Sequence, residues 1–340
     1  MKKLAIVTDF NAVSFREVSR DIALALKGKV KPTIYNWNVQ TIPEKNILFV
    51  GNVFHLTINY CQRFLPRKNV IFYSITEGPP ILDSASRNLA KQITFIAPSN
   101  YAKTCLETVG LDCEAVIPHG IDLNRTYDHE FLTHLKQSLP QPTKVEPSNI
   151  MLCVAGNWKR KALDKLLVAF KTVEKVVKDS FLILHSGIGH YNIINLYELL
   201  ELKRFWFTNL WGVLPKTKLE SLYALCDIYV QPSMSEGFGL TYLEAFKYNK
   251  PVIGVDCPAT NEIVKDGYTG ILIPATKTEN YVWQQRHAIR LHHFNVDDLI
   301  DAMIMLTEPK IRQQFIDNIQ KEKQKYDFKK TYSKFLKYLE

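Results

Sequence analysis

The feature that most constrains this chain is a regular alternation of short apolar runs with amphipathic stretches from one end to the other. Runs that are apolar throughout predict strands buried on both faces, and the amphipathic segments between them are typical of crossover helices. The sequence therefore predicts an α/β chain with two doubly wound parallel sheets. The predicted strands are 4–8, 33–37, 47–50, 70–75, 94–97 and 115–118 in the first half, and 150–155, 181–185, 205–210, 228–231, 252–255 and 270–273 in the second.

A proline-rich stretch separates the two halves. Residues 138–148 contain three prolines and no periodic pattern, which is typical of a linker. We predict a Rossmann-like N-terminal domain over 1–140, a linker over 141–149, a second Rossmann-like domain over 150–310, and C-terminal helices over 311–340 that pack back on the first domain. Residues 275–293 show no strand pattern, so we expect an insertion or loop there. Two facing domains of this kind bind ligands in the cleft at the carboxyl ends of their strands.

Composition and charge limit the classes of protein and of partner. A chain that is 46% hydrophobic and 23% charged folds rather than staying disordered. Its 43 Lys and Arg residues against 34 Asp and Glu give a net charge of +9. We interpret most of this excess as solvated helix faces, with peripheral association at an anionic membrane as an alternative and nucleic-acid binding less favoured.

The cysteines and the apolar runs bear on location. The six cysteines form no C-x-x-C pair, which favours reduced thiols. No apolar run is long enough to span a bilayer, and Asp9 interrupts the first run too early for a signal peptide. We therefore expect a cytoplasmic protein.

The most informative motif runs from Gln231 to Glu244, where a strand passes through a glycine-containing loop into a helix. Gly237 and Gly239 let the backbone approach a ligand closely, and the free N–H groups of the first helical turn favour an anion. Glu244 lies one turn into the helix, where its carboxylate can accept two hydrogen bonds from a vicinal diol such as a ribose. An acidic helix start that only complements the helix dipole is the alternative for Glu244 alone.

The motif as a whole, with Gly-Phe-Gly between Glu236 and Glu244, resembles the signature of the retaining glycosyltransferases of family 4. Residues 97–99, 116–122, 209–215 and 261–273 are similar to further segments of that family, so the resemblance covers most of the chain. It implies the GT-B fold, a UDP- or GDP-sugar donor, and transfer with retention without a metal ion or another cofactor. The acceptor stays open between a lipid, a glycan, a protein and a small molecule.

The resemblance also implies roles for individual residues. Glu244 is expected to hold the ribose hydroxyls, and Glu236 is expected near the transferred sugar. The remaining donor-binding positions are the backbone amides for the diphosphate, at Gly237, Phe238, Gly239 and Leu240, and the segment for the base, at Val213 and Leu214.

Three further residues complete the predicted catalytic set. The family's Gly-Arg…Lys-Gly pattern reads Gly-Asn-Trp-Lys-Arg-Lys-Ala at 156–162, so Arg160 and Lys161 are the candidates for stabilising the departing diphosphate. A solvated helix start is the alternative for this pair. Glu77 follows a strand where the family commonly has a His. Its carboxylate could accept the acceptor's proton or bind the donor sugar, or it could be an ordinary turn residue.

Other functions stay open beside the glycosyltransferase. A GT-B sugar-nucleotide epimerase would need carboxylate acid–base pairs in the cleft. A non-catalytic sugar-nucleotide or polyanion-binding protein is suggested by residues 8–13, which lack the family's Gly-Gly turn near the acceptor. The sequence has no Walker loop and no G-x-S-x-G, and its one loose D-x-D-like triplet, at 128–130, lies outside a strand end, so we predict no metal site.

Overall fold

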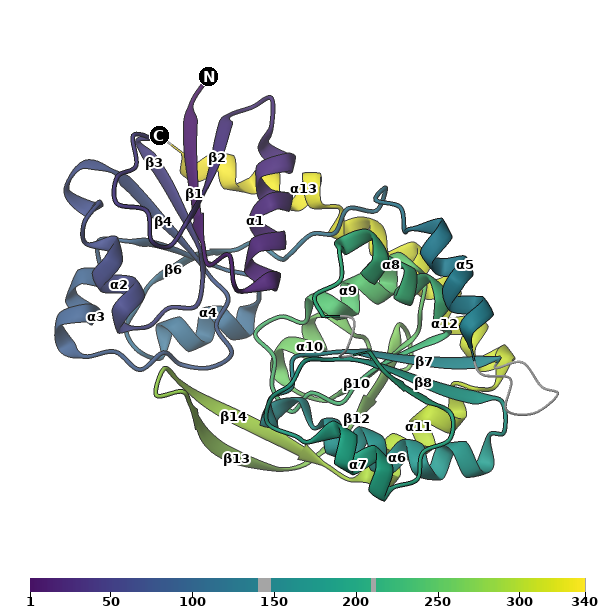
Figure 1. The fold of residues 1–340 in the computed structure, drawn as a ribbon. Helices are drawn as coiled ribbons and strands as arrows, with labels where there is room; N and C mark the ends of the chain where they lie inside the picture. The colour runs from purple at the N-terminus through teal and green to yellow at the C-terminus, as the bar shows by residue number, and fades with distance from the viewer. Residues whose placement is uncertain (140–147, 209–211, 340) are drawn as a thin grey trace.

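The computed structural model describes residues 1–139, 148–208 and 212–339, without the side chain of Arg67. Most of the predicted linker therefore lies outside the described residues. Two six-stranded sheets dominate the structure, in the orders β2-β1-β3-β4-β5-β6 and β12-β11-β10-β7-β8-β9 (Figure 1). All of their strand pairs are parallel. The predicted fold class, two Rossmann-like domains, is confirmed.

Each predicted apolar run overlaps one of these strands, because strands covered on both faces need apolar side chains at every position. The first sheet consists of β1 (Lys3–Thr8), β2 (Lys31–Asn36), β3 (Asn46–Gly51), β4 (Asn69–Ser74), β5 (Thr94–Ala97) and β6 (Cys113–Val116). The second consists of β7 (Asn149–Val154), β8 (Ser180–His185), β9 (Phe205–Phe207), β10 (Ile228–Gln231), β11 (Val252–Val255) and β12 (Gly270–Ile273).

Amphipathic helices cover the sheets. In α1, for example, Val18, Ile22 and Leu26 recur at helical spacing and are buried against the first sheet. The helices of the first half are α1 (Val13–Leu26), α2 (His55–Cys61), α3 (Ser84–Ala90), α4 (Asn100–Glu107) and α5 (His129–Ser138). Those of the second half are α6 (Leu163–Val176), α7 (Ile193–Leu199), α8 (Lys216–Leu225), α9 (Leu240–Lys247), α10 (Pro258–Ile263), α11 (Val296–Met305), α12 (Pro309–Glu322) and α13 (Phe328–Tyr332).

The C-terminal segment 311–340, which we expected to pack back on the first domain, contacts both domains. Helix α12 lies on the second domain, because Phe315 and Ile319 belong to the apolar clusters there. From Phe328 onward the chain crosses to the first domain, where Phe328, Tyr332 and Phe335 join the cluster beneath α1 (Figure 1).

The expectation of an irregular loop over 275–293 is wrong. This segment forms an antiparallel hairpin of β13 (Ala275–Trp283) and β14 (His287–Phe294). Its tight turn holds Gln284 and Gln285 at φ of 50° and 55°, a conformation that normally selects Asn or Gly. Because glutamine is not typical of such a turn, the sequence does not indicate a hairpin here, although the side chains of β14 do alternate between buried and exposed.

The hairpin connects the two domains. Its inner face packs on the second domain through Ile289 and Leu291, and its turn reaches the first domain, where the Ala288 N–H donates to the Pro79 carbonyl over 2.9 Å. The Ile81 N–H likewise donates to the Arg286 carbonyl over 2.8 Å. In Figure 1 the hairpin lies below the first domain and runs to the side of the second, near α7. None of the described helices is long and apolar enough to cross a membrane.

Candidate active site

The four predicted catalytic residues come from three loops at the carboxyl ends of strands. Glu77 follows β4 of the first sheet, Arg160 and Lys161 follow β7, and Glu236 follows β10. β7 and β10 are neighbours in the second sheet, so their loops leave from the same edge. The two domains face each other there, which brings Glu77 to the other three residues.

These four residues form one ion-pair network, which we call the charge network. Arg160 donates from Nη2 to Oε1 of Glu77, and its Nη1 lies 3.6 Å from Oε2 of Glu236. Lys161 donates from Nζ to Oε1 of Glu236, which also accepts from Gln231 Nε2 over 2.6 Å. Arg160 therefore bridges carboxylates of both domains, and the network contains two cations and two anions.

Burial and charge set the protonation of the network. Burial opposes ionisation of Glu236, but Lys161 and Arg160 outweigh it and lower the pKa of that carboxyl to about 2. Burial raises the pKa of Glu77, whose Oε2 is buried with no hydrogen-bond partner among the described residues. Burial and the neighbouring Arg160 lower the pKa of Lys161. Glu236 is thus held as an anion, while Glu77 is the carboxyl that takes up a proton more readily.

The glycine loop, residues 232–239, lies directly against the first domain. A Cβ at Gly237 would collide with the Thr76 carbonyl, and Ser99 Oγ donates to the Gly237 carbonyl over 2.7 Å. Gly239 has a φ of 102° and precedes the first turn of α9, whose opening N–H groups have no partner within the helix. The Phe238 ring is buried against His119, at 4.7 Å between centroids, so only its backbone is available to a ligand.

Glu244 lies on α9 with both carboxylate oxygens engaged. Lys216 donates to Oε1, and the Tyr223 hydroxyl donates to Oε2 over 2.7 Å. Burial opposes the charge of Lys216, but the carboxylates of Glu244 and Glu220 together outweigh it and raise the pKa of that ammonium. Each carboxylate oxygen has a second lone pair, so a diol could still be accepted beside these partners.

The predicted base-binding positions lie at the start of the segment that leads into α8. Val213 is exposed, and Leu214 is half-buried against the cluster under α5 and α8. Residues 209–211 of the same predicted segment lie outside the described residues. The roles of Val213 and Leu214 stay predictions.

Sequence reasoning missed the partners that hold the predicted residues. Lys216 and Tyr223 lie on α8, 28 and 21 residues from Glu244, and no motif connects them. Gln231 was noted only as a strand end.

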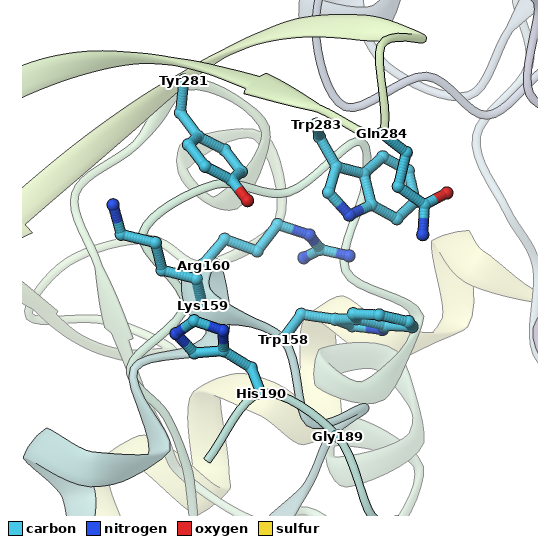
Figure 2. Close-up of a pocket in the computed structure, with 8 residues that line it drawn as sticks. All are labelled: Trp158, Lys159, Arg160, Gly189, His190, Tyr281, Trp283 and Gln284. Carbon is cyan, nitrogen blue, oxygen red and sulfur yellow. The ribbon is translucent and has the colours of Figure 1, made fainter.

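Sequence reasoning also missed a pocket beside the charge network, which we call the hairpin pocket. It has a volume of about 250 Å³ and is lined by residues 158–160, Gly189, His190, Tyr281, Trp283 and Gln284 (Figure 2).

The chain is similar to known glycosyltransferases in sequence and in fold. Residues 136–293 match the sequence model of the family described as glycosyl transferases group 1. A protein described as an uncharacterized glycosyltransferase from Sulfolobus islandicus rod-shaped virus 1 is 27% identical over 98% of this chain and 99% of its own length. The O-antigen biosynthesis glycosyltransferase WclY of Escherichia coli is 28% identical over 51% of this chain, which is 49% of its own length.

Solved structures share the whole fold. HepE of Anabaena, in complex with UDP and glucose, superimposes with a TM-score of 0.74 at 15% identity over 99% of both chains. A glycosyltransferase of Rickettsia africae gives 0.73 at 15% identity over 99% of this chain and 97% of its own. At such identities the likeness shows the GT-B fold, and the chemistry must come from the residues of this chain.

Proposed function

Because the chain carries a group 1 glycosyltransferase domain within a GT-B fold, we propose that it is a retaining glycosyltransferase of the family 4 type. It would move a hexose-like sugar from a nucleoside-diphosphate donor to an acceptor hydroxyl. The observation that carries this proposal is the charge network, which puts a guanidinium and an ammonium beside the glycine loop and the N-terminus of α9.

The proposed reaction exchanges one C–O bond for another. The bond between the anomeric carbon and the β-phosphate oxygen breaks, and its electron pair leaves with the diphosphate. The acceptor oxygen forms the new bond from the same face, and its proton passes to the departing phosphate. Arg160 and Lys161 would stabilise the negative charge that develops there, a contribution that is large in a buried site. Since they supply this charge, we propose a reaction that needs no metal ion.

The carboxylates have different proposed roles. Glu236 keeps Arg160 and Lys161 in position before the donor arrives and faces the transferred sugar. Glu77, whose Oε2 has no hydrogen-bond partner in the part of the chain that the structure describes, is available to a hydroxyl of the donor sugar or acceptor. Glu244 would hold the ribose, with Lys216 and Tyr223 fixing its orientation.

We propose a UDP-sugar as the donor ahead of a GDP-sugar, because the similar structures of HepE and of a pneumococcal O-GlcNAc transferase, GtfA, hold UDP. A cytoplasmic location stays a prediction. It is supported by the six cysteines, all of which are buried and unpaired.

Calorimetry with UDP and GDP tests the donor site. Replacing Glu244→Gln should weaken binding of the preferred nucleotide by ~2 kcal/mol, about thirtyfold, because a charge-assisted contact to the ribose is lost. Glu322→Gln, a matched change at a carboxylate paired with Lys265 away from the cleft, should leave the affinity unchanged. Equal affinities for the wild type and Glu244→Gln would remove Glu244 from the site.

Measuring turnover of the donor tests the roles of Arg160 and Lys161 and distinguishes a transferase from the alternative functions. Arg160→Ala and Lys161→Ala should lower turnover of the donor more than they lower UDP affinity, because their charge counts most as the diphosphate departs. Conversion of the donor to an epimeric nucleotide sugar without release of free nucleotide would identify an epimerase. Binding without turnover would identify a sugar-nucleotide-binding protein.

A further inference from the structure

We infer that the hairpin pocket binds a sugar ring of the acceptor, so that the acceptor of this enzyme is a saccharide or a molecule that ends in one. The inference rests on the proposed glycosyl transfer and names the acceptor class, which neither the sequence nor the comparisons indicate. It is carried by the aromatic walls of the pocket, by its polar groups and by its position against Arg160.

Aromatic rings form the walls of the pocket. Trp158 follows β7, and Tyr281 and Trp283 stand on the same face of β13 (Figure 2). The Trp158 and Trp283 rings meet edge to face, 6.1 Å between centroids, and Trp283 stacks on the buried His287. Trp158 is nevertheless 42% exposed. Rigid rings that stay accessible to solvent suit the apolar C–H face of a sugar, and large aromatic groups of this kind dominate ligand contacts.

Hydroxyl-binding groups surround these rings. The Gln284 side-chain amide and the His190 imidazole line the pocket, and both kinds of group can donate and accept hydrogen bonds (Figure 2). Arg160 is 94% buried, since its exposure is 6%, and its Nε has no hydrogen-bond partner in the described part of the chain. A buried donor without a partner is costly, so it indicates a group that a ligand satisfies.

The charges of the pocket favour a neutral ligand. Lys159 is paired with Glu279 over 3.2 Å, and Glu279 also contacts His293 Nε2 over 2.8 Å. Arg160 is paired with Glu77 and Glu236. Lys159 is thus neutralised by Glu279, and Arg160 is already assigned to the donor diphosphate, so the pocket offers no further cation for a second anion, whereas hydroxyl groups need no net charge. The chemistry therefore fits a saccharide better than a nucleotide or another anion.

The position of the pocket connects it to the reaction. Arg160 is both a wall of the pocket and the bridge between the carboxylates of the charge network. A cavity of about 250 Å³ is smaller than the roughly 300–1,000 Å³ of pockets that take drug-sized ligands, so it suits one ring of a larger acceptor. The contacts of the hairpin with Pro79 and Ile81 fix this wall relative to the first domain.

Saccharide binding can be measured independently of donor binding. Saturation-transfer NMR would use the methyl glycosides of glucose, galactose, mannose and N-acetylglucosamine, together with maltose, cellobiose and lactose, each with and without UDP. UDP affinity would be measured on the same samples by calorimetry. We expect at least one of these saccharides to bind, and Trp283→Ala to weaken it about tenfold, the loss expected when an aromatic contact is removed.

Two further variants separate loss of the pocket from loss of the fold. Val282→Ala is the matched control, because Val282 lies on the opposite face of the same strand and is 56% exposed, so it should bind like the wild type. Gln284→Asn keeps a residue that tolerates the positive φ but shortens the amide, and it should also weaken binding.

The outcomes distinguish the two proposals. UDP binding without binding of any saccharide would overturn the pocket assignment and leave the proposed function standing. The assignment would also be overturned if neither Trp283→Ala nor Gln284→Asn changed saccharide binding. The same holds if both variants lost UDP binding. Saccharide binding without binding of UDP or GDP would support the pocket and contradict the proposed function.

Discussion

Removing the ammonium of Lys161 tests how strongly the charge network depends on its internal pairing. The side chains of Lys161 and Glu236 are only 9% and 7% exposed, and breaking a buried pair by removing one partner costs about 3–5 kcal/mol. Glu236 would keep Gln231 at 2.6 Å and Arg160 at 3.6 Å. We therefore expect Lys161→Met to lower the free energy of unfolding by about 3 kcal/mol, at the lower end of that range.

Urea denaturation of four variants, Lys161→Met, Glu236→Gln, their double variant and Lys265→Met, measures this effect. Lys265→Met removes a cation from the exposed Lys265–Glu322 pair, which solvent screens, so it should change stability by less than about 1 kcal/mol. The double variant Lys161→Met/Glu236→Gln should cost less than the sum of its single changes, because no unpaired carboxylate stays buried. The reasoning would be refuted if Lys161→Met lowered the free energy of unfolding as little as Lys265→Met does. It would also be refuted if the effects of Lys161→Met and Glu236→Gln on this free energy were strictly additive.

Three further predictions concern the surroundings of the site. Burial lowers the pKa of His119 to about 3, so between pH 6.5 and 3 the unfolded chain binds a proton that the folded chain does not. The free energy of unfolding should therefore fall as the pH falls from 7 to 5, and urea titrations of His119→Asn should show a weaker pH dependence. Gly237→Ala should lower thermal stability and UDP affinity because its Cβ meets the Thr76 carbonyl, whereas Gly187→Ala, with open space around its Cβ, should change neither. Phe328→Ala should lower the free energy of unfolding by about 3–5 kcal/mol, because it opens a cavity beneath α1; a loss under about 1 kcal/mol would contradict the packing of the C-terminal segment.

The strands could be predicted because their signal is local. A strand buried on both faces needs an apolar side chain at each position, so β3 and β8 can be recognised from a few consecutive residues. The hairpin could not be predicted in the same way. Its turn has glutamines in a left-handed conformation, and most side chains of β13 are exposed, so neither a turn residue nor an apolar run marks it.

The candidate site likewise has a part that the sequence predicts and a part that it does not. Arg160, Lys161, Glu236 and Glu244 belong to short motifs, so the sequence alone makes them candidates. Their pairing depends on the relative placement of two domains. The contact between Arg160 and Glu77 joins residues 83 positions apart and exists only because the loops after β4 and β7 meet. No periodicity within one element carries that information.

The central claim is that the chain breaks the anomeric bond of a nucleotide sugar with retention. It is tested most directly by proton NMR of donor hydrolysis without acceptor, with UDP-glucose, UDP-N-acetylglucosamine and GDP-mannose, in which water takes the place of the acceptor. Each of these donors carries an α-linked sugar, so we predict that free nucleoside diphosphate appears with the α-anomer of the sugar before mutarotation. The account would be contradicted if the β-anomer of the free sugar appeared first. It would also be contradicted if all three donors stayed intact in the presence of the folded wild-type protein.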